Sequence, residues 1–296
     1  MAKFPQEFID FVNENPKLVS RRESIRYPGL FVLKYSRKVF YDALWNDYLE
    51  ECRGTVVDKD WNVVILPFRK IYNRGENGMD FPLDLKVEKV EKINGFMAAA
   101  TYVEGHGVVV STTGSLDSDF VSMAEKWLMP SIIPWIEERG HGFTWLFEIC
   151  DPSDPHIIKE LPGVYLIGAR LIEYGGMSSE DDLDYVALRM GVKRPNHIKL
   201  SFKTVLEHAK NYQREGYVVR GDNGQSLKIK SPYYLLTKFI ARANNSKFED
   251  IMNGNFDKTI DEEFYPLLAH LRKHRGNVMN MTEQDRIKYI GDFFGK

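Results

Sequence analysis

The sequence predicts an α+β fold in which antiparallel sheet dominates, followed by a smaller all-helical part. From about residue 30 to residue 231, short runs rich in β-branched and aromatic residues alternate with turn residues. After Ser231, apolar residues instead recur three and four positions apart, which is typical of amphipathic helices. A chain of 296 residues is long enough for one large domain followed by a small one.

The expected elements follow one another along the chain. Phe4, Phe8 and Ile9 are spaced as on one face of a short helix near the N-terminus. Strands are then expected at 29–36, 53–58, 61–68, 92–103, 106–114, 143–149, 163–173, 215–221 and 226–231. Between them, residues 118–140 have helical spacing, which ends at Gly140.

The tail is expected to contain helices at 233–243, 261–274 and 282–294. Thr282 followed by Asp285 resembles a capping box at the start of the last helix. We therefore divide the chain into a main domain, residues 1–235, and a C-terminal helical domain, residues 236–296.

Composition restricts the class of protein. The formal net charge is −2, so no overall positive field indicates nucleic-acid binding, although a local basic patch remains compatible with it. Cys52 and Cys150 are too few for a disulfide framework and fit a reducing compartment. No segment has the roughly 20 apolar residues of a membrane span, and the N-terminus has no secretory pattern. We expect a cytoplasmic protein, or one of the host cytoplasm if it is viral.

Lys92 is the first candidate for chemistry, because it stands two residues before an Asn-Gly pair with β-type runs on either side. Asn-Gly predicts a tight hairpin turn, which would put Lys92 at the mouth of a hairpin. A lysine acts as a nucleophile only when its pKa is lowered enough to make the amine neutral. Taken alone, the pattern favours a surface lysine beside a turn over a reactive one.

Lys228 and Lys230 alternate with Leu227 and Ile229, so both lysines lie on one face of the predicted strand. Two neighbouring ammonium groups repel each other unless an anion such as phosphate lies between them, and they would lower the pKa of a nearby lysine. The alternative is an amphipathic strand with a solvated lysine face.

Two glutamates, Glu148 and Glu215, stand against strongly apolar strand residues. A carboxylate in such surroundings needs a cation, a metal or a ligand hydroxyl as its partner. Upstream, Arg53 and Lys70 lie near strand ends, and they suit phosphate contacts unless they pair with Glu51 or Glu76. The run of Asp, Ser and Pro that starts at Asp151 is more typical of a turn than of a metal site.

The order of these features resembles the covalent nucleotidyltransferases, which carry AMP or GMP on a lysine. The stretches LEECRGTVVD, PFRKIYNRGENG, FTWLFEICDPSDPHII and LKIKSPYYLL are similar to those of ATP-dependent RNA ligases of the first T-even phage type. The resemblance runs from about Phe31 to Leu236. It implies a nucleotidyltransferase domain of the ATP-grasp-like ligase kind, ahead of the helical tail.

The resemblance also implies roles for individual residues. Lys92 becomes the AMP-carrying nucleophile, and Lys228 and Lys230 hold the α-phosphate. Glu148 is implied in both catalysis and nucleotide binding, and Glu215 in holding a metal. The remaining matches are Tyr35, Arg53 and Lys70 at the nucleotide and Tyr234 just beyond the lysine pair.

The sequence departs from the family pattern at two positions. Asn94 stands where Asp is common, and an Asn serves a tight turn equally well. Thr113 stands where the family has a lysine, which removes one phosphate-binding cation.

By resemblance, the protein is an ATP-dependent RNA ligase that uses ATP and Mg²⁺ or Mn²⁺ to join 5′-phosphate and 3′-hydroxyl RNA ends. A DNA ligase or capping guanylyltransferase is the first alternative, but these usually carry a further β-barrel where this tail is helical. A non-catalytic nucleotide- or RNA-binding module is the second. We expect a monomer without membrane contact, served by a separate end-healing kinase and phosphatase.

Overall fold

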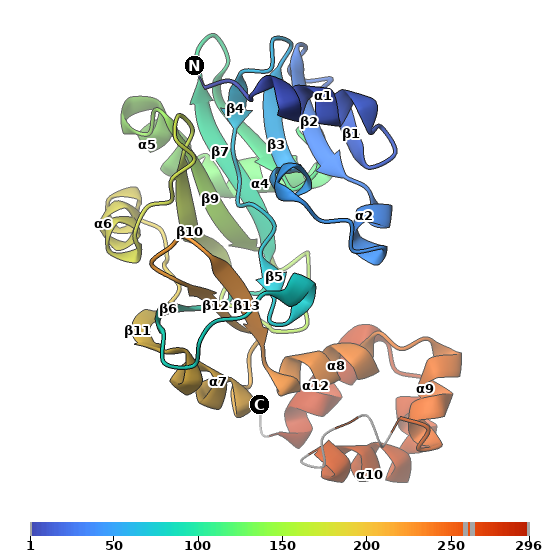
Figure 1. Ribbon diagram of the computed structural model, residues 1–296. Coiled ribbons are helices and arrows are strands. Elements are labelled where there is room, and N and C mark those ends of the chain that lie inside the picture. Colours follow the sequence, from blue (N-terminus) through green and yellow to red (C-terminus); the bar gives the residue numbers. More distant parts are fainter. Residues whose placement is uncertain (1, 257–259, 261–263, 295–296) are drawn as a thin grey trace.

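The computed structural model describes residues 2–256, 260 and 264–294, which form three sheets and a C-terminal group of helices (Figure 1). All strand pairs are antiparallel except β13 (Ser226–Lys230) with β5 (Tyr72–Asn73), which run parallel. The predicted α+β class with dominant antiparallel sheet is confirmed. Among the described residues, no helix is both long and apolar enough to cross a membrane.

The first sheet has the strand order β1-β2-β3-β4. Helix α1 (Gln6–Glu14), the predicted N-terminal helix, packs Phe8, Ile9 and Val12 on this sheet. Short helices α2 (Arg37–Tyr41) and α3 (Asp47–Glu51) connect β2 to β3. The strands are β1 (Val19–Glu23), β2 (Leu30–Tyr35), β3 (Arg53–Asp58) and β4 (Val63–Ile65).

The second sheet, of order β10-β9-β7-β8, shares an apolar core with the first sheet, in which Val56 and Ile65 meet Ala99 and Leu146. Helices α4 (Asp119–Leu128), α5 (Ile132–Arg139) and α6 (Glu180–Met190) contribute to a second core on this sheet. The single helix predicted at 118–140 is therefore two helices, separated where Pro130 interrupts the pattern. The strands are β7 (Phe96–Val103), β8 (Gly107–Thr112), β9 (Phe143–Cys150) and β10 (Gly163–Leu171).

The third sheet, of order β11-β6-β12-β13-β5, holds the lysine strand between β12 and β5. Helix α7 (Phe202–Lys210) covers one face with Phe202, Val205 and Ala209. The elements that the sequence patterns did not predict include α6, α7, β6 and β11. The remaining elements are β6 (Lys86–Glu91), β11 (His197–Ser201), β12 (Gly216–Arg220) and the one-turn 3₁₀ helix η1 (Glu76–Gly78).

The hairpin predicted at Asn94-Gly95 is wrong. β6 pairs with β11 and β12, whereas β7 pairs with β8 and β9, so residues 92–95 cross from the third sheet to the second. Neither Asn94 nor Gly95 has a positive φ. Glycine is required here for a different reason, because a Cβ on Gly95 would lie 2.2 Å from the carbonyl oxygen of Ile149.

The C-terminal helices are α8 (Pro232–Ala241), α9 (Asn245–Met252), α10 (Tyr265–Lys273), α11 (Arg275–Val278) and α12 (Glu283–Phe293). The predicted capping box is confirmed, since Thr282 and Asp285 exchange both hydrogen bonds. The first three residues of the predicted 261–274 helix lie outside the described residues. The change from strand to helix falls at Pro232, close to the expected domain boundary at 235/236, and that boundary stays a prediction.

Candidate active site

Lys92 lies at the crossing between the second and third sheets, with its backbone N–H bonded to the carbonyl of Gly216 at 3.0 Å. Its Nζ donates to Oε2 of Glu215 at 3.0 Å. Glu215 directly precedes β12, and its side chain is 4% exposed, whereas the Lys92 side chain is 23% exposed. The ammonium group is therefore paired with a buried carboxylate and still reaches the surface of the site.

Asn94 holds this pair in place. Its Nδ2 donates to the same Glu215 oxygen at 2.6 Å, and its Oδ1 accepts from the backbone N–H of Ile158 at 2.9 Å. Asn94 is 7% exposed. The residue expected to serve a turn instead uses its amide group to connect Glu215 with the loop that follows β9.

Glu148 reaches the crossing from β9. Its Oε1 accepts from the backbone N–H of Gly95 at 3.1 Å. Burial raises the pKa of Glu148, while the charge of Lys92 and the Gly95 hydrogen bond partly offset that rise. The two predicted glutamates thus come to Lys92 from two different sheets.

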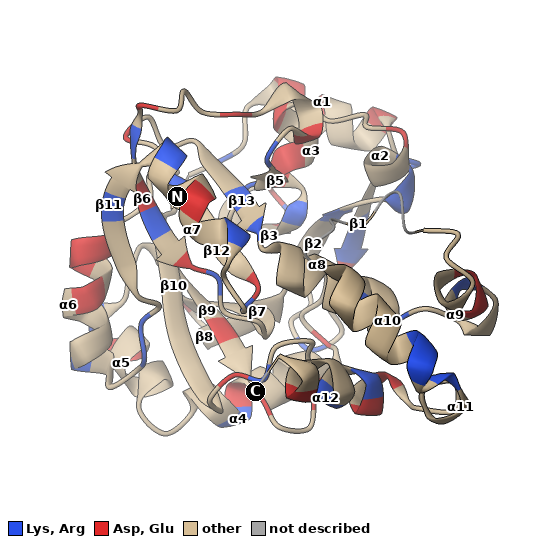
Figure 2. Ribbon diagram, turned by 90° about the horizontal axis from the view of Figure 1, so that it is seen from below, with Lys and Arg blue, Asp and Glu red and all other residues tan. Residues whose placement is uncertain are grey.

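Lys228 and Lys230 lie on β13, in a basic region of the third sheet (Figure 2). Lys230 Nζ lies 5.7 Å from the ring centroid of Tyr234, at the start of α8. Tyr234 is buried, and its pKa is raised by burial and by the charge of Glu215. The structure therefore places the lysine pair, Tyr234 and Glu215 close to one another.

Lys70 joins the site from the segment between β4 and β5. Its Nζ donates to Oε1 of Glu76 at 2.6 Å, so the ion pair that the sequence left open as an alternative is present. The same Nζ lies 4.9 Å from the ring centroid of Trp45, which meets the ring of Tyr35 edge to face at 4.8 Å. Tyr35 is thus connected to the site through Trp45.

The charges at this site act differently on its lysines. Burial lowers the pKa of Lys92, but the carboxylates of Glu148 and Glu215 outweigh it, so the pKa is raised overall. Burial lowers the pKa of Lys228 to about 7, helped by the charges of Lys70 and Arg53. The expected lowering of the Lys92 pKa by the lysine pair is therefore wrong in this structure, because the carboxylates dominate.

Arg53 is the first residue of β3. Its charge lowers the pKa of Lys228, so it lies among the cations near that lysine. Its neighbour Gly54 packs against the backbone of Thr113, since a Cβ there would lie 3.0 Å from the Thr113 Cα. A Cβ on Gly114 would lie 2.4 Å from Nζ of Lys34. Position 113 thus has no cation of its own, but the Lys34 ammonium lies against the next residue.

Sequence reasoning missed two contributions to the site. Trp45 lies in a loop without any periodic pattern, so nothing in the sequence marks its contact with Lys70. The side-chain bonds of Asn94 were missed because its local signal for a turn is strong. Glu76 was considered only as an alternative partner of Lys70.

The loop that follows β9 behaves as a turn rather than as a metal site. Asp151 accepts from the backbone and hydroxyl of Ser153 at 2.8 and 2.6 Å, and Asp154 pairs with His156 at 2.9 Å. Within the described part of the chain, no three His, Cys, Asp or Glu side chains cluster so as to hold a metal alone.

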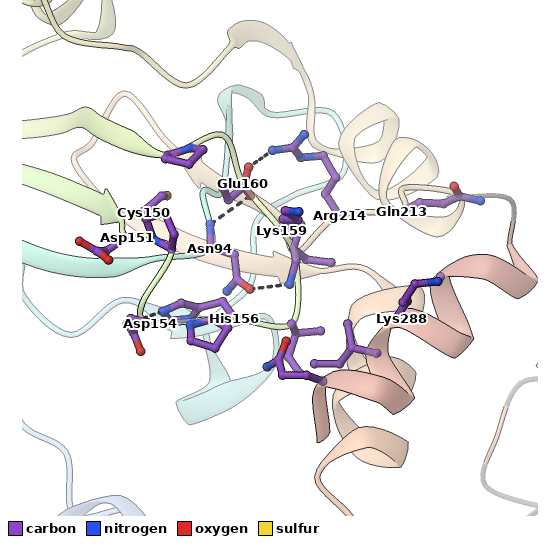
Figure 3. A pocket seen from close by; sticks show the side chains of 18 of the residues that line it. Asn94, Cys150, Asp151, Asp154, His156, Lys159, Glu160, Gln213, Arg214 and Lys288 are labelled. Atoms are coloured by element: carbon purple, nitrogen blue, oxygen red, sulfur yellow. Dashed lines mark hydrogen bonds and ion pairs between the residues drawn. The ribbon is translucent and has the colours of Figure 1, made fainter. Parts of the chain in front are cut away.

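This loop also lines a cavity of about 720 Å³ between the sheets and helix α12 (Figure 3). Asn94 forms part of its wall, and Glu160 pairs there with Arg214. Lys288 and Asp292 of α12 pair with each other on the opposite side. The helical tail therefore borders a cavity whose wall includes Asn94, two residues after Lys92.

The site combines a lysine between two buried carboxylates with a separate group of cations. Carboxylate oxygens are suitable ligands for Mg²⁺, which commonly binds one or two of them together with substrate phosphates. Glu215 and Glu148 thus fit a divalent metal when a nucleotide completes its coordination. The cations fit the phosphates, and the lysine fits attack on phosphorus.

The fold is the one that ATP-dependent ligases of known structure have. An archaeal ATP-dependent RNA ligase has the same fold with a TM-score of 0.61, over 97% of this chain and 82% of that chain, at 15% identity. A putative ATP-dependent DNA ligase from Aquifex aeolicus gives a TM-score of 0.57, over 96% of this chain and 79% of that chain, at 14% identity. At these identities the likeness establishes the fold alone.

Within that class, the chain belongs to the RNA ligase family, whose model matches residues 51–234. A curated RNA ligase from Rhodothermus phage RM378 is 24% identical to it, over 71% of this chain and 59% of that protein. The chain thus spans less than two thirds of the length of that relative. The family membership predicted from the order of the motifs is confirmed.

Proposed function

We propose that the protein is an ATP-dependent RNA ligase that joins a 5′-phosphate end to a 3′-hydroxyl end through AMP carried on Lys92. The observation that supports this most directly is the position of the Lys92 Nζ. It contacts buried Glu215 and is influenced by Glu148, in a chain of the RNA ligase family.

In the first proposed step, Lys92 gives up a proton and its Nζ lone pair attacks the α-phosphorus of ATP. A P–N bond forms, the amine releases a second proton to solvent, the bond to the oxygen that bridges to the β-phosphate breaks, and pyrophosphate leaves. Lys228 and Lys230 are proposed to stabilise the negative charge on the transferring phosphoryl group. Arg53 and Lys70 are proposed to bind the rest of the nucleotide, with Tyr35 acting through Trp45.

In the second step, an oxygen of the RNA 5′-phosphate attacks the AMP phosphorus, the P–N bond breaks, and Lys92 recovers a proton. In the third, the 3′-hydroxyl oxygen attacks the RNA 5′-phosphorus and loses its proton to solvent, and the bond from that phosphorus to the AMP oxygen breaks, which releases AMP. A divalent metal held by Glu215, with Glu148 nearby, would supply further charge stabilisation. Tyr234 is proposed to position Lys230 through the contact between its ring and the ammonium group.

The test is incubation with ATP labelled at the α-phosphate and Mg²⁺, followed by denaturing electrophoresis. We expect a covalent AMP label that is absent from Lys92→Arg, which keeps the charge but not the primary amine. A GMP label from GTP would instead support a capping enzyme, and no label from either nucleotide would support a binding module. A panel of nicked, looped and linear RNA and DNA strands then separates RNA from DNA ligation.

We also infer a partner enzyme, an oligomeric state and a location for the protein from this chemistry. Ends with 5′-phosphate and 3′-hydroxyl groups are made from other broken ends by a kinase and a phosphatase, so an end-healing partner is proposed. Action as a monomer in the cytoplasm, or in a host cytoplasm, is proposed with it. The division at 235/236 is supported by the start of α8 at Pro232 and by the separate apolar core that the tail helices share.

A further inference from the structure

A second cavity, of about 430 Å³, opens beside strand β13. Its walls come from the end of β5, from α7, from β13 and from the first turn of α8. Every Lys, Arg, Asp or Glu among its described lining residues is basic: Arg74, Lys210, Lys228 and Lys230. Because no carboxylate lines it, this cavity favours an anion.

The larger cavity next to α12 does not share this property. It is lined by three Lys or Arg side chains and four Asp or Glu side chains. Glu160 neutralises Arg214, and Asp292 neutralises Lys288. Its size would accept a ligand, but its charge balance gives a polyanion no advantage there.

Two of the basic residues in the smaller cavity lie outside the candidate active site. Arg74 pairs with Asp80 at 3.0 Å, but both side chains are nearly half exposed, and such surface pairs contribute little free energy. Lys210, the last residue of α7, is exposed. Both cations are therefore available to a ligand that enters from solvent.

The other two basic residues, Lys228 and Lys230, are those proposed to contact the reacting phosphate. The cavity thus begins at the site of phosphoryl transfer and ends at Arg74 and Lys210. Arg53 and Lys70, the proposed partners of the nucleotide, do not line it. At its rim, Leu235 is 49% exposed and offers an apolar surface for a base or ribose.

We propose that this cavity binds the phosphodiester backbone of the single-stranded RNA being sealed, with Arg74 and Lys210 contacting phosphates next to the reacting one. The proposal rests on the proposed RNA ligase function. A chain of phosphates matches the line of cations, and the open rim lets a polymer continue into solvent. The leaving pyrophosphate is the competing occupant, and the experiment distinguishes the two.

The test compares Arg74→Gln, Lys210→Gln and the double variant with wild type. Lys203→Gln is the matched control, because Lys203 is exposed on the same helix and does not line the cavity. One assay measures lysyl-AMP formation against ATP concentration. The other measures single-turnover sealing of a short 5′-adenylylated RNA against RNA concentration, at several salt concentrations.

We expect each cavity variant to raise the RNA concentration for half-maximal sealing several-fold. The slope of log affinity against log salt should fall by roughly 0.7 for each phosphate that no longer has a cationic partner. The ATP concentration for half-maximal lysyl-AMP formation should stay unchanged, and Lys203→Gln should match wild type in both assays.

Unchanged RNA half-saturation and salt slope in the double variant would overturn the proposal. A higher ATP requirement with unchanged RNA behaviour would also overturn it, by assigning the cavity to the pyrophosphate. If wild type forms no lysyl-AMP, the ligase function fails, and binding of the same RNA measured by fluorescence anisotropy still tests the cavity. Circular dichroism checks folding. Because Lys210 is exposed, Lys210→Gln is expected to fold, and it still tests the proposal if Arg74→Gln misfolds.

Discussion

The side-chain amide of Asn94 donates to the same Glu215 oxygen that receives the Lys92 ammonium group, at 2.6 and 3.0 Å. Asn94 also accepts from the backbone of Ile158, whose side chain belongs to the apolar core of the helical tail. One residue thus connects the candidate nucleophile, the candidate metal ligand and the loop that contacts the tail.

Asn94→Asp would keep the acceptor for Ile158 but place a second carboxylate against Glu215. Burial and the like charge raise the pKa of the new carboxyl in the folded state. The variant loses no unfolding free energy from this effect at low pH, where the carboxyl is protonated in both the folded and unfolded states. The loss grows as pH rises, because the folded state then holds a buried charge. We expect the variant to lose on the order of 1–3 kcal/mol of unfolding free energy at pH 8, and less at pH 5, measured by urea unfolding.

A matched control exists on the surface. Asn196 donates to Glu91 at 3.1 Å in an exposed pair, so Asn196→Asp introduces the same chemical change where water screens it. Its loss should be small and nearly independent of pH. Equal losses of unfolding free energy in the two variants would show that the buried Asn94 contact is no more sensitive to the added charge than the surface contact is.

The rate of lysyl-AMP formation should keep increasing as the pH is raised beyond 8, because the carboxylates hold the pKa of Lys92 above its ordinary value. Glu148→Gln keeps an acceptor for Gly95 and removes one of these charges. We expect the midpoint of its pH–rate profile to move to lower pH, even where its rate is reduced. An unchanged midpoint, measured under single-turnover conditions, would argue against control by Glu148.

Lys228 should take up a proton when a nucleotide binds. Its pKa is about 7 in the free protein, and a phosphate raises it by favouring the charged form. Binding of a non-hydrolysable ATP analogue at pH 8 should take up roughly 0.9 proton, and almost none below pH 6. Calorimetry in buffers with different ionisation enthalpies measures this uptake.

Lys228→Arg is the control for this proton uptake, because its guanidinium stays charged throughout this range. Uptake that persists in Lys228→Arg would assign the proton to another group.

Lys92→Ala and Lys228→Ala should fail in different ways. Lys92 is needed covalently only to load AMP, so Lys92→Ala should be inactive with ATP but still seal a 5′-adenylylated RNA. Loss of Lys228 should slow both loading and sealing, by on the order of 3 kcal/mol or roughly a hundredfold per step. Single-turnover sealing without ATP measures the difference. Wild-type sealing by Lys228→Ala would contradict its placement on the reacting phosphate.

Deletion of residues 244–296 should lower the thermal unfolding midpoint, because it exposes Tyr233, Ile157 and Ile158, which are buried against the tail. We expect lysyl-AMP formation to persist below that midpoint, since no proposed nucleotide contact lies beyond Tyr234. A folded truncation that forms no lysyl-AMP would show that the tail is part of the adenylylation site.

Local patterns in the sequence determined much of this protein. Alternation along a strand is a property of the extended backbone, so the common face of Lys228 and Lys230 follows from their spacing alone. The capping box of Thr282 and Asp285 is likewise local, and it forms as predicted. The order of the motifs also sufficed to identify the family.

Only the tertiary structure decided how Lys92 and its neighbours are used. The Asn94-Gly95 pair has the local signal of a hairpin, but the pairing of β6 and β7 with strands of different sheets gives it another conformation. The Lys92 pKa depends on carboxylates that lie 56 and 123 positions further along the chain, whereas the pKa values of Lys228 and Lys230 are lowered. Sequence spacing cannot predict these effects, because Coulomb energies and desolvation depend on distances through space that only the folded chain sets.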